Sequence, residues 1–214
     1  MIVLIFDTET TGLPRFRVTP NNNNISTWPY IVQLSYILYD TDKNKIITTY
    51  DSIVKLPKNI IISEESSNIH GISNGMSQKS GYDIKDILKI FNIALEKCDL
   101  LVGHNLEFDI DMILAESLRN SIPYEHIITH NNYCTMKNSK NLCNIKAKSY
   151  KGGFYIKYPS LKETHIKLFN VEPKNLHNSF NDVLVCLRCY YFMNFNEDLC
   201  GINKNFNVLY KKYC

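Results

Sequence analysis

The sequence predicts a single α/β domain in which a mixed β-sheet is flanked by helices, and three observations support this. The chain has 214 residues, 44% hydrophobic and 21% charged, which is enough for one sizeable core and too few for two comfortable domains. Three strand-like segments come first as a meander, and strand-like and helical segments then alternate. No internal repeat or linker divides the chain.

Strands are predicted where β-branched and aromatic residues form apolar runs. Residues 2–6 contain no polar member, which is typical of a central strand buried on both faces. Four consecutive asparagines at 21–24 indicate a surface loop, and residues 57–81 are polar and irregular. The predicted strands cover residues 2–6, 30–39, 46–54, 100–102 and 127–133, the second and third being joined by a short hairpin-like connection.

Helices are predicted where apolar residues recur three and four positions apart behind a capping residue. Asp83 is placed to cap one helix, and Ser160 with Glu163 matches the capping-box pattern at the start of another. The predicted helices cover residues 83–97, 105–119, 160–169 and 179–193. We expect the domain to end near residue 195, with residues 196–214 as a peripheral C-terminal extension.

Composition excludes several classes of protein. The most apolar window, residues 25–39, is broken by serine, threonine, proline and glutamine and is too polar to span a membrane. The apolar N-terminus lacks a basic region, so no signal peptide is expected. Seven cysteines without a regular framework indicate a reducing intracellular compartment, cytoplasm or nucleus. A net charge of +3 permits a nucleic-acid partner, and the scarcity of arginine among the 24 basic residues indicates an AT-rich genome.

Asp7 and Glu9 follow the first predicted strand at its C-terminal end, where α/β sheets usually bind ligands. Residues two apart on a strand face the same side, so both carboxylates can point into one site. Two carboxylates at that distance repel each other, and a hard divalent cation is the usual remedy. Taken alone, such a pair is more often two solvated acids at a strand end.

A second polar segment starts the helix that follows the strand at 100–102. Asn105 and Asp109 are four residues apart and share one helix face. Asn105 could also be an N-cap, and Asp109 could be an exposed helical acid. Glu107 and Asp111 lie on other faces and are interpreted as ordinary surface acids.

A third polar segment precedes the last predicted helix. Ser179 suits an N-cap, and Asp182 lies in the first turn, where the helix dipole favours a carboxylate. His177 lies in the preceding loop, and the alternative is simply a well-capped helix. Each segment is a weak signal alone, but the set could supply four carboxylates and one histidine to a single pocket.

These three segments resemble the exonuclease motifs of the DEDDh (DnaQ-like) 3′→5′ exonuclease family. The matching segments are residues 6–13, 103–109 and 177–182, with lesser matches at 31–33 and 69–72. The histidine five residues before the aspartate of the third motif separates this branch from relatives with tyrosine there. The resemblance covers about residues 1–193, so residues 1–195 would form the exonuclease domain. It implies an RNase H-like fold, a five-stranded mixed sheet with helices on both sides.

The resemblance also implies two-metal hydrolysis at phosphorus. Asp7, Glu9 and Asp182 would bind one Mg²⁺, and Asp7 would bridge to a second ion held largely by substrate phosphate. Asp109 would complete the site through water, and Mn²⁺ is expected to substitute. His177 would take the proton from the attacking water, as an imidazole can near neutral pH. By analogy, the terminal nucleotide would be held by Thr8, Thr10, Leu13, His70 and Asn105.

The expected function is removal of nucleoside 5′-monophosphates from single-stranded or frayed DNA 3′ ends. Proofreading or repair would act with a polymerase in trans, because no polymerase region follows. An RNA-trimming exoribonuclease is the alternative enzyme, since the same site cleaves either backbone. A non-catalytic nucleic-acid-binding subunit is the alternative outside enzymes, and the intact set of five residues opposes it.

Residues 126–162 contain no acid and are rich in lysine and aromatic residues. The lysines are Lys137, Lys140, Lys146, Lys148, Lys151, Lys157 and Lys162, and the aromatic residues are Tyr133, Tyr150, Phe154, Tyr155 and Tyr158. Lysines on phosphates and aromatic rings on bases hold single strands without sequence preference. A solvated loop, made flexible by Gly152 and Gly153, whose aromatic residues pack under the next helix is an equal alternative. This connection and residues 15–29 are long for the family.

Cysteines offer a zinc hypothesis. Cys186 and Cys189 have the spacing of a zinc knuckle, with Cys200 and Cys214 downstream. The first two lie within a predicted helix among apolar residues, so thiols that pack as small hydrophobic groups are the favoured interpretation. The other candidates, Cys134 and Cys143, are no stronger.

Overall fold

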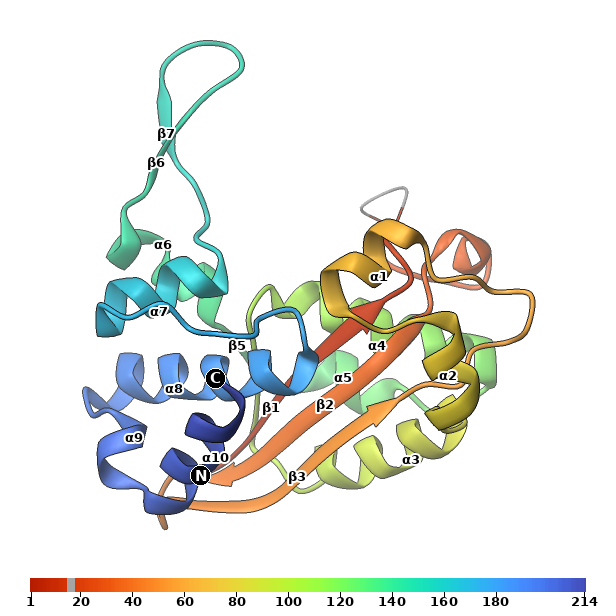
Figure 1. Cartoon of the computed structure of the whole chain (residues 1–214), viewed down its shortest axis with the longest axis horizontal. Coiled ribbons are helices and arrows are strands. Elements are labelled where there is room, and N and C mark those ends of the chain that lie inside the picture. The colour runs from red at the N-terminus through yellow and green to blue at the C-terminus, as the bar shows by residue number, and fades with distance from the viewer. Residues whose placement is uncertain (15–17) are drawn as a thin grey trace.

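A mixed five-stranded sheet forms the centre of the structure (Figure 1). The structure, a computed structural model, describes residues 1–14 and 18–214. The strand order is β3-β2-β1-β4-β5, with β1, β2 and β3 antiparallel and β4 and β5 parallel to β1, as expected for the mixed sheet. The strands are β1 (Ile2–Thr10), β2 (Ile31–Asp40), β3 (Lys45–Ile53), β4 (Leu100–Gly103) and β5 (Asn132–Cys134).

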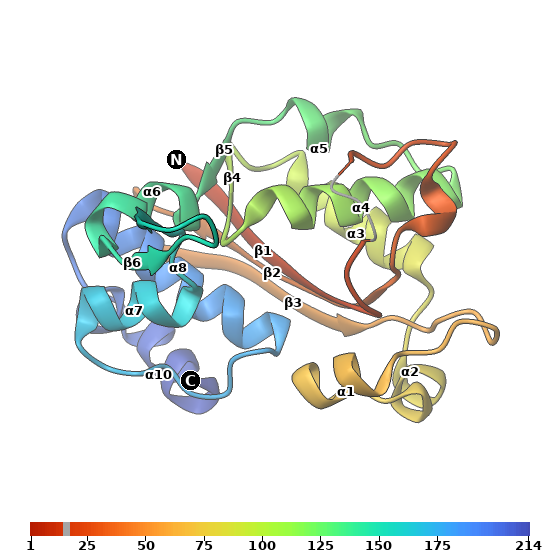
Figure 2. The same ribbon diagram turned by 90° about the horizontal axis from the view of Figure 1, so that it is seen from above.

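Helices cover both faces of this sheet (Figure 2), with α3 and α4 on one face and α8 on the other. Among the described residues, no helix has the length and apolar character needed to cross a membrane. The helices are η1 (Ile25–Thr27), α1 (Glu64–His70), α2 (Asn74–Ser80), α3 (Ile84–Leu95), α4 (Leu106–Asn120), α5 (Glu125–Thr129), α6 (Thr135–Cys143), α7 (Leu161–Phe169), α8 (Ser179–Phe195), α9 (Leu199–Ile202) and α10 (Lys204–Tyr213).

The two-residue period of β1 divides the core into two layers. Leu4 and Phe6 are buried in the layer shared with α3 and α4. Val3 and Ile5 are buried in the layer shared with α8. Because Asp7 has the same parity as Val3 and Ile5, its side chain lies on the α8 face of the sheet.

Strand β1 is longer than the predicted strand 2–6. It pairs with β2 as far as Ile31, with an irregularity between Glu9 and Thr10. Strand β4, in contrast, pairs only with the apolar residues Val3, Leu4 and Ile5 of β1. The polar end of β1 therefore extends beyond its parallel neighbour, so its acidic residues lie within the strand and not after it.

Two predicted segments are wrong. Residues 57–81 contain α1 and α2, which are capped by the side chains of Ser63 and Ser73. Both helices are 7 residues long and mostly polar, so the apolar period that reveals longer helices is absent. The first half of the predicted strand 127–133 belongs to the helix α5. Within that predicted strand, only the residues of β5 pair with β4. Its β-branched residues favour a strand locally, but Ile127 is buried from a helix.

The C-terminal residues, expected to be peripheral, form α9 and α10 and pack into the core on the α8 face. Phe206 is fully buried and Tyr210 is 8% exposed. Arg188 of α8 holds Asp198, which caps α9, in a bidentate ion pair with N···O distances of 2.7 and 2.9 Å. Residues 199–213 are thus part of the packed domain.

The lysine-rich segment forms helices and strands, where a loop was one of the two alternatives. It contains α5, β5 and α6, followed by a separate antiparallel hairpin of β6 (Lys146–Lys148) and β7 (Phe154–Ile156). Helix α7 then begins with the predicted capping box of Ser160 and Glu163, which is confirmed. The predicted cap of α3 is also confirmed, since the Asp83 side chain accepts a hydrogen bond from the Lys85 N–H.

Candidate active site

Three carboxylates from two distant segments meet at the polar end of β1. Asp7 and Glu9 on β1, and Asp182 in the first turn of α8, each offer an oxygen atom, and these atoms lie within 4.8 Å of one another. Within residues 1–14 and 18–214, this is the one group of three or more potential metal-ligating side chains so closely placed. Strand parity places the first two on the α8 face, and the start of α8 supplies the third.

Asp109 lies beside this group in the first turn of α4. Its side chain is 3% exposed, and its Oδ1 atom accepts hydrogen bonds from the Thr8 backbone N–H at 3.0 Å and the Thr8 hydroxyl at 2.8 Å. The turn before α4 approaches β1 closely because Gly103 has no side chain: a Cβ there would lie 2.8 Å from a Leu106 methyl group and 3.3 Å from the Phe6 carbonyl oxygen.

Burial raises the pKa of all four carboxyl groups, and repulsion from neighbouring acids adds to this for Asp7, Glu9 and Asp109. Burial, followed by the neighbouring acids, raises the pKa of Asp7 well above its ordinary value and that of Glu9 to about 8. Burial raises the pKa of Asp109 to about 7 despite the hydrogen bonds from Thr8. Burial also raises the pKa of Asp182 to about 7. A bound cation would reverse these shifts by favouring the charged forms.

The donor set fits a hard divalent cation. Carboxylate oxygens are the ligands that Mg²⁺ and Mn²⁺ prefer in proteins. The Oδ1 atom of Asp182 is buried and has no hydrogen-bond partner among the described residues. Its Oδ2 atom accepts a hydrogen bond from the His177 backbone N–H at 3.2 Å. One oxygen of Asp182 is thus positioned by the protein, and the other is left for a ligand.

A partly buried polar network fixes the start of α8 to the sheet. Ser179, predicted as the N-cap, is the first helical residue, and Asn178 occupies the N-cap position. The Ser179 hydroxyl lies 2.6 Å from that of Ser35, and its N–H donates to Gln33 at 3.2 Å. Asp51 on β3 accepts hydrogen bonds from both Gln33 and Ser35, at 2.7 and 2.8 Å. The network connects β2, β3 and α8, and it sets the position of the first turn of α8 relative to the sheet.

Sequence reasoning noticed Gln33 but missed Ser35 and Asp51. Ser35 is directly opposite Asp7 in the sheet, and Asp51 is opposite Ser35, so all three lie on one face. A polar residue within the otherwise apolar strand β2, in register with the acidic pair, was the signal that could have found them.

The structure brings His177 and His70 to one pocket. This pocket of about 400 Å³ lies between the end of α1 and the loop before α8. His177 is exposed there, with a left-handed backbone (φ 68°). His70 is buried, accepts a hydrogen bond from the Ile72 N–H at Nδ1, and has no partner for Nε2 among the described residues. Burial lowers the pKa of His70, which favours a neutral ring with a polar atom available to a ligand.

The other predicted substrate residues fall into two groups. The hydroxyl groups of Thr8 and Thr10 are engaged within the protein, the first as described above and the second with the Gly12 carbonyl at 2.7 Å. Leu13 is 82% exposed. Asn105 is exposed in a left-handed conformation at the N-cap position of α4, and its side chain makes no capping bond. Leu13 and Asn105 are therefore free to contact a ligand.

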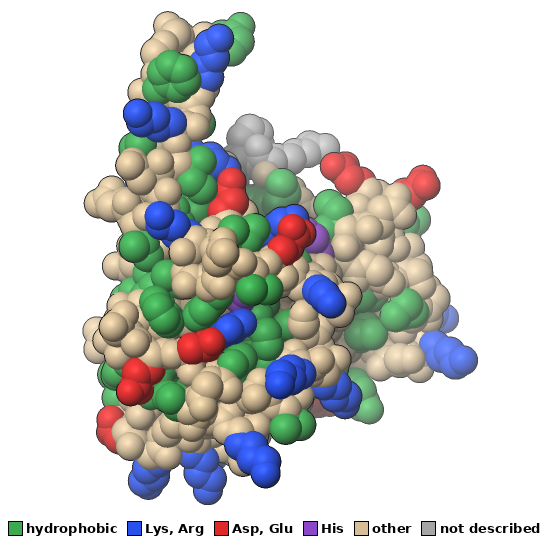
Figure 3. Space-filling view, turned by 60° about the vertical axis from the view of Figure 1, so that its left-hand side comes forward, with side chains coloured by type: hydrophobic (Ala, Val, Ile, Leu, Met, Phe, Trp, Pro, Cys, Tyr) green, Lys and Arg blue, Asp and Glu red, His purple; other side chains and the backbone are tan. Residues whose placement is uncertain are grey.

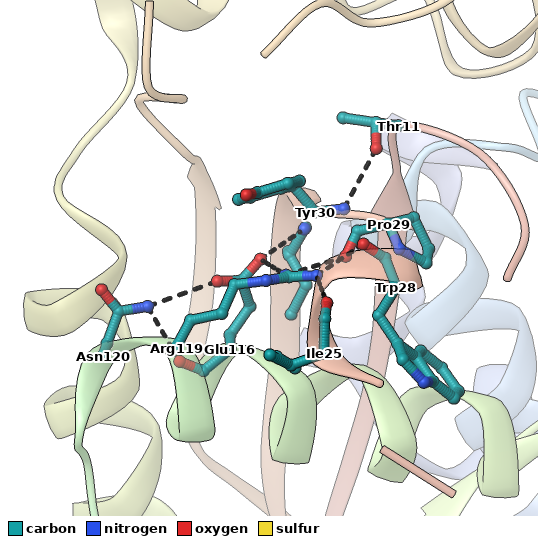
Figure 4. Close-up of polar contacts among 9 residues, drawn as sticks. Thr11, Ile25, Trp28, Pro29, Tyr30, Glu116, Arg119 and Asn120 are labelled. Carbon is teal, nitrogen blue, oxygen red and sulfur yellow. Dashed lines mark hydrogen bonds and ion pairs between the residues drawn. The ribbon is translucent and has the colours of Figure 1, made fainter. Parts of the chain in front are cut away.

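The long connection after β1 is tied to α4 by Arg119 (Figure 4). Arg119 forms a buried ion pair with Glu116 at 2.8 Å and lies over the Tyr30 ring, 3.9 Å from its centre. Its guanidinium donates hydrogen bonds to the backbone carbonyls of Ile25, Trp28 and Pro29. Tyr30 in turn exchanges two hydrogen bonds with Thr11, at 2.9 and 3.0 Å. The predicted long connection 15–29 is thus anchored to α4 through its C-terminal half. Its residues 15–17 lie outside the described part of the chain.

The acids set aside as surface residues differ from each other. Glu107 is exposed and pairs with Lys137, as expected of a surface acid. Asp111 is half-buried, and this burial raises the pKa of its carboxyl group to about 6. It is therefore not an ordinary surface acid.

The favoured interpretation of the cysteines is confirmed. Cys186 and Cys189 are 3% and 0% exposed in the core layer of α8, where burial raises the pKa of both thiols. Cysteine takes no part in any close metal-ligating group within the described residues. The thiols of α8 pack as small hydrophobic groups.

Comparison with known proteins places the chain in a family. A family model described as exonuclease (RNase_T) matches residues 4–190. Similar solved structures include E. coli exonuclease I in complex with a dA16 oligonucleotide, with a TM-score of 0.65 and 15% identity over 98% of this chain and 43% of that one. Exonuclease I from Methylocaldum szegediense has a TM-score of 0.64 and 13% identity over 95% of this chain and 43% of that one.

The structural matches and the family model support different conclusions. This chain spans less than half the length of those exonuclease I chains, and the low identity shows the fold alone. No curated protein matches the sequence. The family model, in contrast, spans most of the chain and includes all three acidic segments. The chain therefore belongs to the RNase_T exonuclease family, as a nuclease of the DEDDh type with an RNase H-like fold.

Proposed function

We propose that this chain is a Mg²⁺-dependent 3′→5′ exonuclease that releases nucleoside 5′-monophosphates from single-stranded or frayed DNA ends. The observation that carries the proposal is the meeting of Asp7, Glu9 and Asp182 within 4.8 Å, with one buried oxygen of Asp182 left unpartnered. Single-stranded DNA is favoured because the similar exonuclease I structures hold dA16 and dT13 oligonucleotides.

The proposed roles follow from where each side chain lies. Asp7, Glu9 and Asp182 hold the divalent ions, and Asp109 stands beside them, oriented by Thr8. Two such ions, when bound, stabilise the attacking and leaving oxygens of a displacement at phosphorus.

The proposed proton acceptor and nucleotide pocket are formed by the loop before α8 and the end of α1. His177 accepts the proton of the attacking water, because its backbone is bonded to Asp182 and its ring is exposed at the pocket. The pocket shared with His70, together with exposed Leu13, holds the terminal nucleotide.

The test is a panel of single variants assayed on matched single-stranded DNA, duplex DNA and RNA, each labelled at either end. Asp7→Asn and Asp182→Asn are expected to abolish hydrolysis with Mg²⁺. His177→Ala is expected to lower the rate by about 10²- to 10⁴-fold, the usual contribution of a positioned base. Glu107→Gln is the matched control, because it removes one exposed negative charge from α4 and should leave the rate unchanged.

The same assay separates the alternatives. Loss of the 3′ label as mononucleotide, before any shortening from the 5′ end, supports the proposed direction. Faster trimming of RNA than of DNA would replace the substrate with RNA. Activity that survives Asp7→Asn or a saturating chelator would overturn the metal-dependent mechanism, and an inert wild-type chain that still binds oligonucleotides would leave a binding subunit.

A further inference from the structure

We infer that the hairpin of β6 and β7 is an arm that binds the single-stranded part of the substrate, away from the nucleotide being removed. The arm is defined as residues 145–158. The inference rests on the proposed function for the substrate class, and it adds a binding surface outside the carboxylate site and the histidine pocket.

The arm stands apart from the body of the protein. Figure 1 shows it projecting beyond α6 and α7, and the space-filling view in Figure 3 shows it as a protrusion. Within the described residues its strands pair with each other alone, through three residue pairs, and form a sheet separate from the central one. Such a small isolated hairpin adds little to the stability of the core, so its side chains are free for another role.

The aromatic residues of the arm face solvent. Tyr150 is fully exposed, Phe154 is 75% exposed and Tyr155 is 53% exposed. Of the five aromatic residues in the lysine-rich segment, only Tyr133 packs inside, edge to face with Tyr190 at 5.2 Å. Packing of the aromatic residues under the next helix, which was one of the two sequence-based alternatives, is therefore wrong for the arm. Clustered exposed rings usually mark a binding surface.

The charges of the arm suit a polyanion. Lys146, Lys148 and Lys151 have no acidic partner among the described residues, whereas Lys157 pairs with Glu163 below the arm. The arm itself contains no acid. Figure 3 shows the Lys and apolar colours on the protrusion, with acidic side chains appearing only below it.

The register of the hairpin places cations and a ring on the same face. Lys148 is opposite Phe154, and Lys146 is opposite Ile156, so these four side chains share one face. Lysines two residues apart on a strand are separated by about 6.6 Å, which is close to the spacing of successive phosphates in an extended single strand. A duplex keeps its bases stacked inside, so exposed rings favour a single strand as the ligand.

The base of the arm is fixed to the active-site side of the fold. The His104 ring lies in the turn before α4, the helix that carries Asp109, and its Nε2 atom is 3.1 Å from the carbonyl oxygen of Pro159 at the foot of the arm. The Lys157 N–H donates to the Ile145 carbonyl at 3.0 Å and closes the base of the hairpin. The arm is therefore held in a defined direction relative to the site.

The test compares two charge-matched triple variants in binding and hydrolysis of a trinucleotide and a 20-nucleotide DNA strand. The arm variant is Lys146→Gln, Lys148→Gln and Lys151→Gln, and the control is Lys85→Gln, Lys89→Gln and Lys97→Gln, on and just after α3. Removing one lysine–phosphate ion pair from a single-strand complex flattens the log–log salt dependence of binding by about 0.7. We therefore expect the slope of the arm variant on the 20-mer to be shallower by about 2 units, with a raised KM and an unchanged turnover at saturation.

The aromatic residues are tested separately. Tyr150→Ala and Phe154→Ala are each expected to weaken 20-mer binding by about 5- to 150-fold, the range for one stacked base. All these variants should unfold at the wild-type temperature, because the altered side chains are exposed.

These experiments test DNA binding by the arm separately from the proposed hydrolysis. If the arm variants bind the 20-mer with wild-type affinity and salt slope, the inference is overturned. If they lose self-association or binding to another protein instead, the arm is a protein-binding surface. An equal loss of affinity for the trinucleotide and the 20-mer would also overturn it. If the wild-type chain hydrolyses nothing but its 20-mer binding depends on the arm, the proposed function fails while the inference stands.

Discussion

Asp7, Glu9, Asp109 and Asp182 are acids held where a negative charge is unfavourable. Burial raises the pKa of each, to about 8 for Glu9 and about 7 for Asp109 and Asp182, and neighbouring carboxylates add to the shift of all but Asp182. The folded protein therefore retains protons that the unfolded chain releases near its ordinary values of 3.8 and 4.5. These raised pKa values oppose ionisation in the metal-free state, and a bound cation would remove this opposition.

A pH dependence of stability follows. A raised folded pKa contributes stability below the unfolded pKa and loses it as the pH rises through the folded pKa. The free energy of unfolding of the metal-free protein should therefore fall between about pH 4 and pH 8, and millimolar Mg²⁺ should restore it at pH 8. Denaturant titrations at a series of pH values measure this. The slope should be smaller in Asp7→Asn and unchanged in Glu107→Gln; equal slopes in both variants would show that the site acids do not cause it.

Arg119 holds two elements of the fold together, because it joins α4 to the connection between β1 and β2. Its partly buried guanidinium forms an ion pair with Glu116, donates hydrogen bonds to three backbone carbonyls and lies over the Tyr30 ring. Breaking a buried pair leaves an uncompensated charge and typically costs about 3 to 5 kcal/mol.

Arg119→Ala is thus expected to lower the free energy of unfolding by about 3 to 5 kcal/mol. It should also increase protease cleavage within residues 18–30, because that segment loses its attachment. The matched control is Lys89→Ala, whose partner Asp86 is in an exposed i,i+3 pair worth less than about 1 kcal/mol. Similar decreases in the two variants, measured by chemical denaturation, would contradict the anchoring role.

Prediction from sequence succeeded for elements whose pattern is long and regular. The strands β2 and β3, rich in β-branched and aromatic residues, and the amphipathic helix α3 with its Asp83 cap were all found. Short polar helices such as α1 and α2 depend on serine caps and on packing, and neither produces a periodic pattern. Helix α5 was mistaken for a strand because three β-branched residues coincide there.

The site was predicted to the extent that it resides in local motifs. Strand parity paired Asp7 with Glu9, and the helix start supplied Asp182, which the structure brings together. Ser35 and Asp51, which take part in fixing the start of α8, are found through cross-strand register, and register is a property of the assembled sheet.

At the scale of the whole molecule, the C-terminal helices complete the second core layer. Phe206 and Tyr210 are buried against α8, and the Tyr210 hydroxyl lies 2.8 Å from Nε2 of His165 on α7. Removing α9 and α10 would expose these surfaces together, at a cost of about 3 to 5 kcal/mol for the phenylalanine alone.

A chain ending at residue 198 is therefore expected to lose cooperative thermal unfolding, as measured by circular dichroism and calorimetry. The matched control replaces residues 147–155 of the arm with a short glycine–serine turn. That replacement removes only residues outside the main core, so it should keep the wild-type unfolding temperature. A truncated chain that unfolds cooperatively at that temperature would show that residues 199–214 are dispensable.

The wide separation of the site residues along the chain also bears on protein synthesis. The acidic cluster joins Asp7 to Asp182, which is 182 − 7 = 175 residues later. A nascent chain folds from its N-terminus as it is made, at about 5 to 20 residues per second. Until α8 has left the ribosome and docked on the sheet, the carboxylates of β1 have no third partner. Nuclease activity would thus begin only after α8 has been synthesised and has docked on the sheet, so a nascent chain that lacks α8 would be inactive.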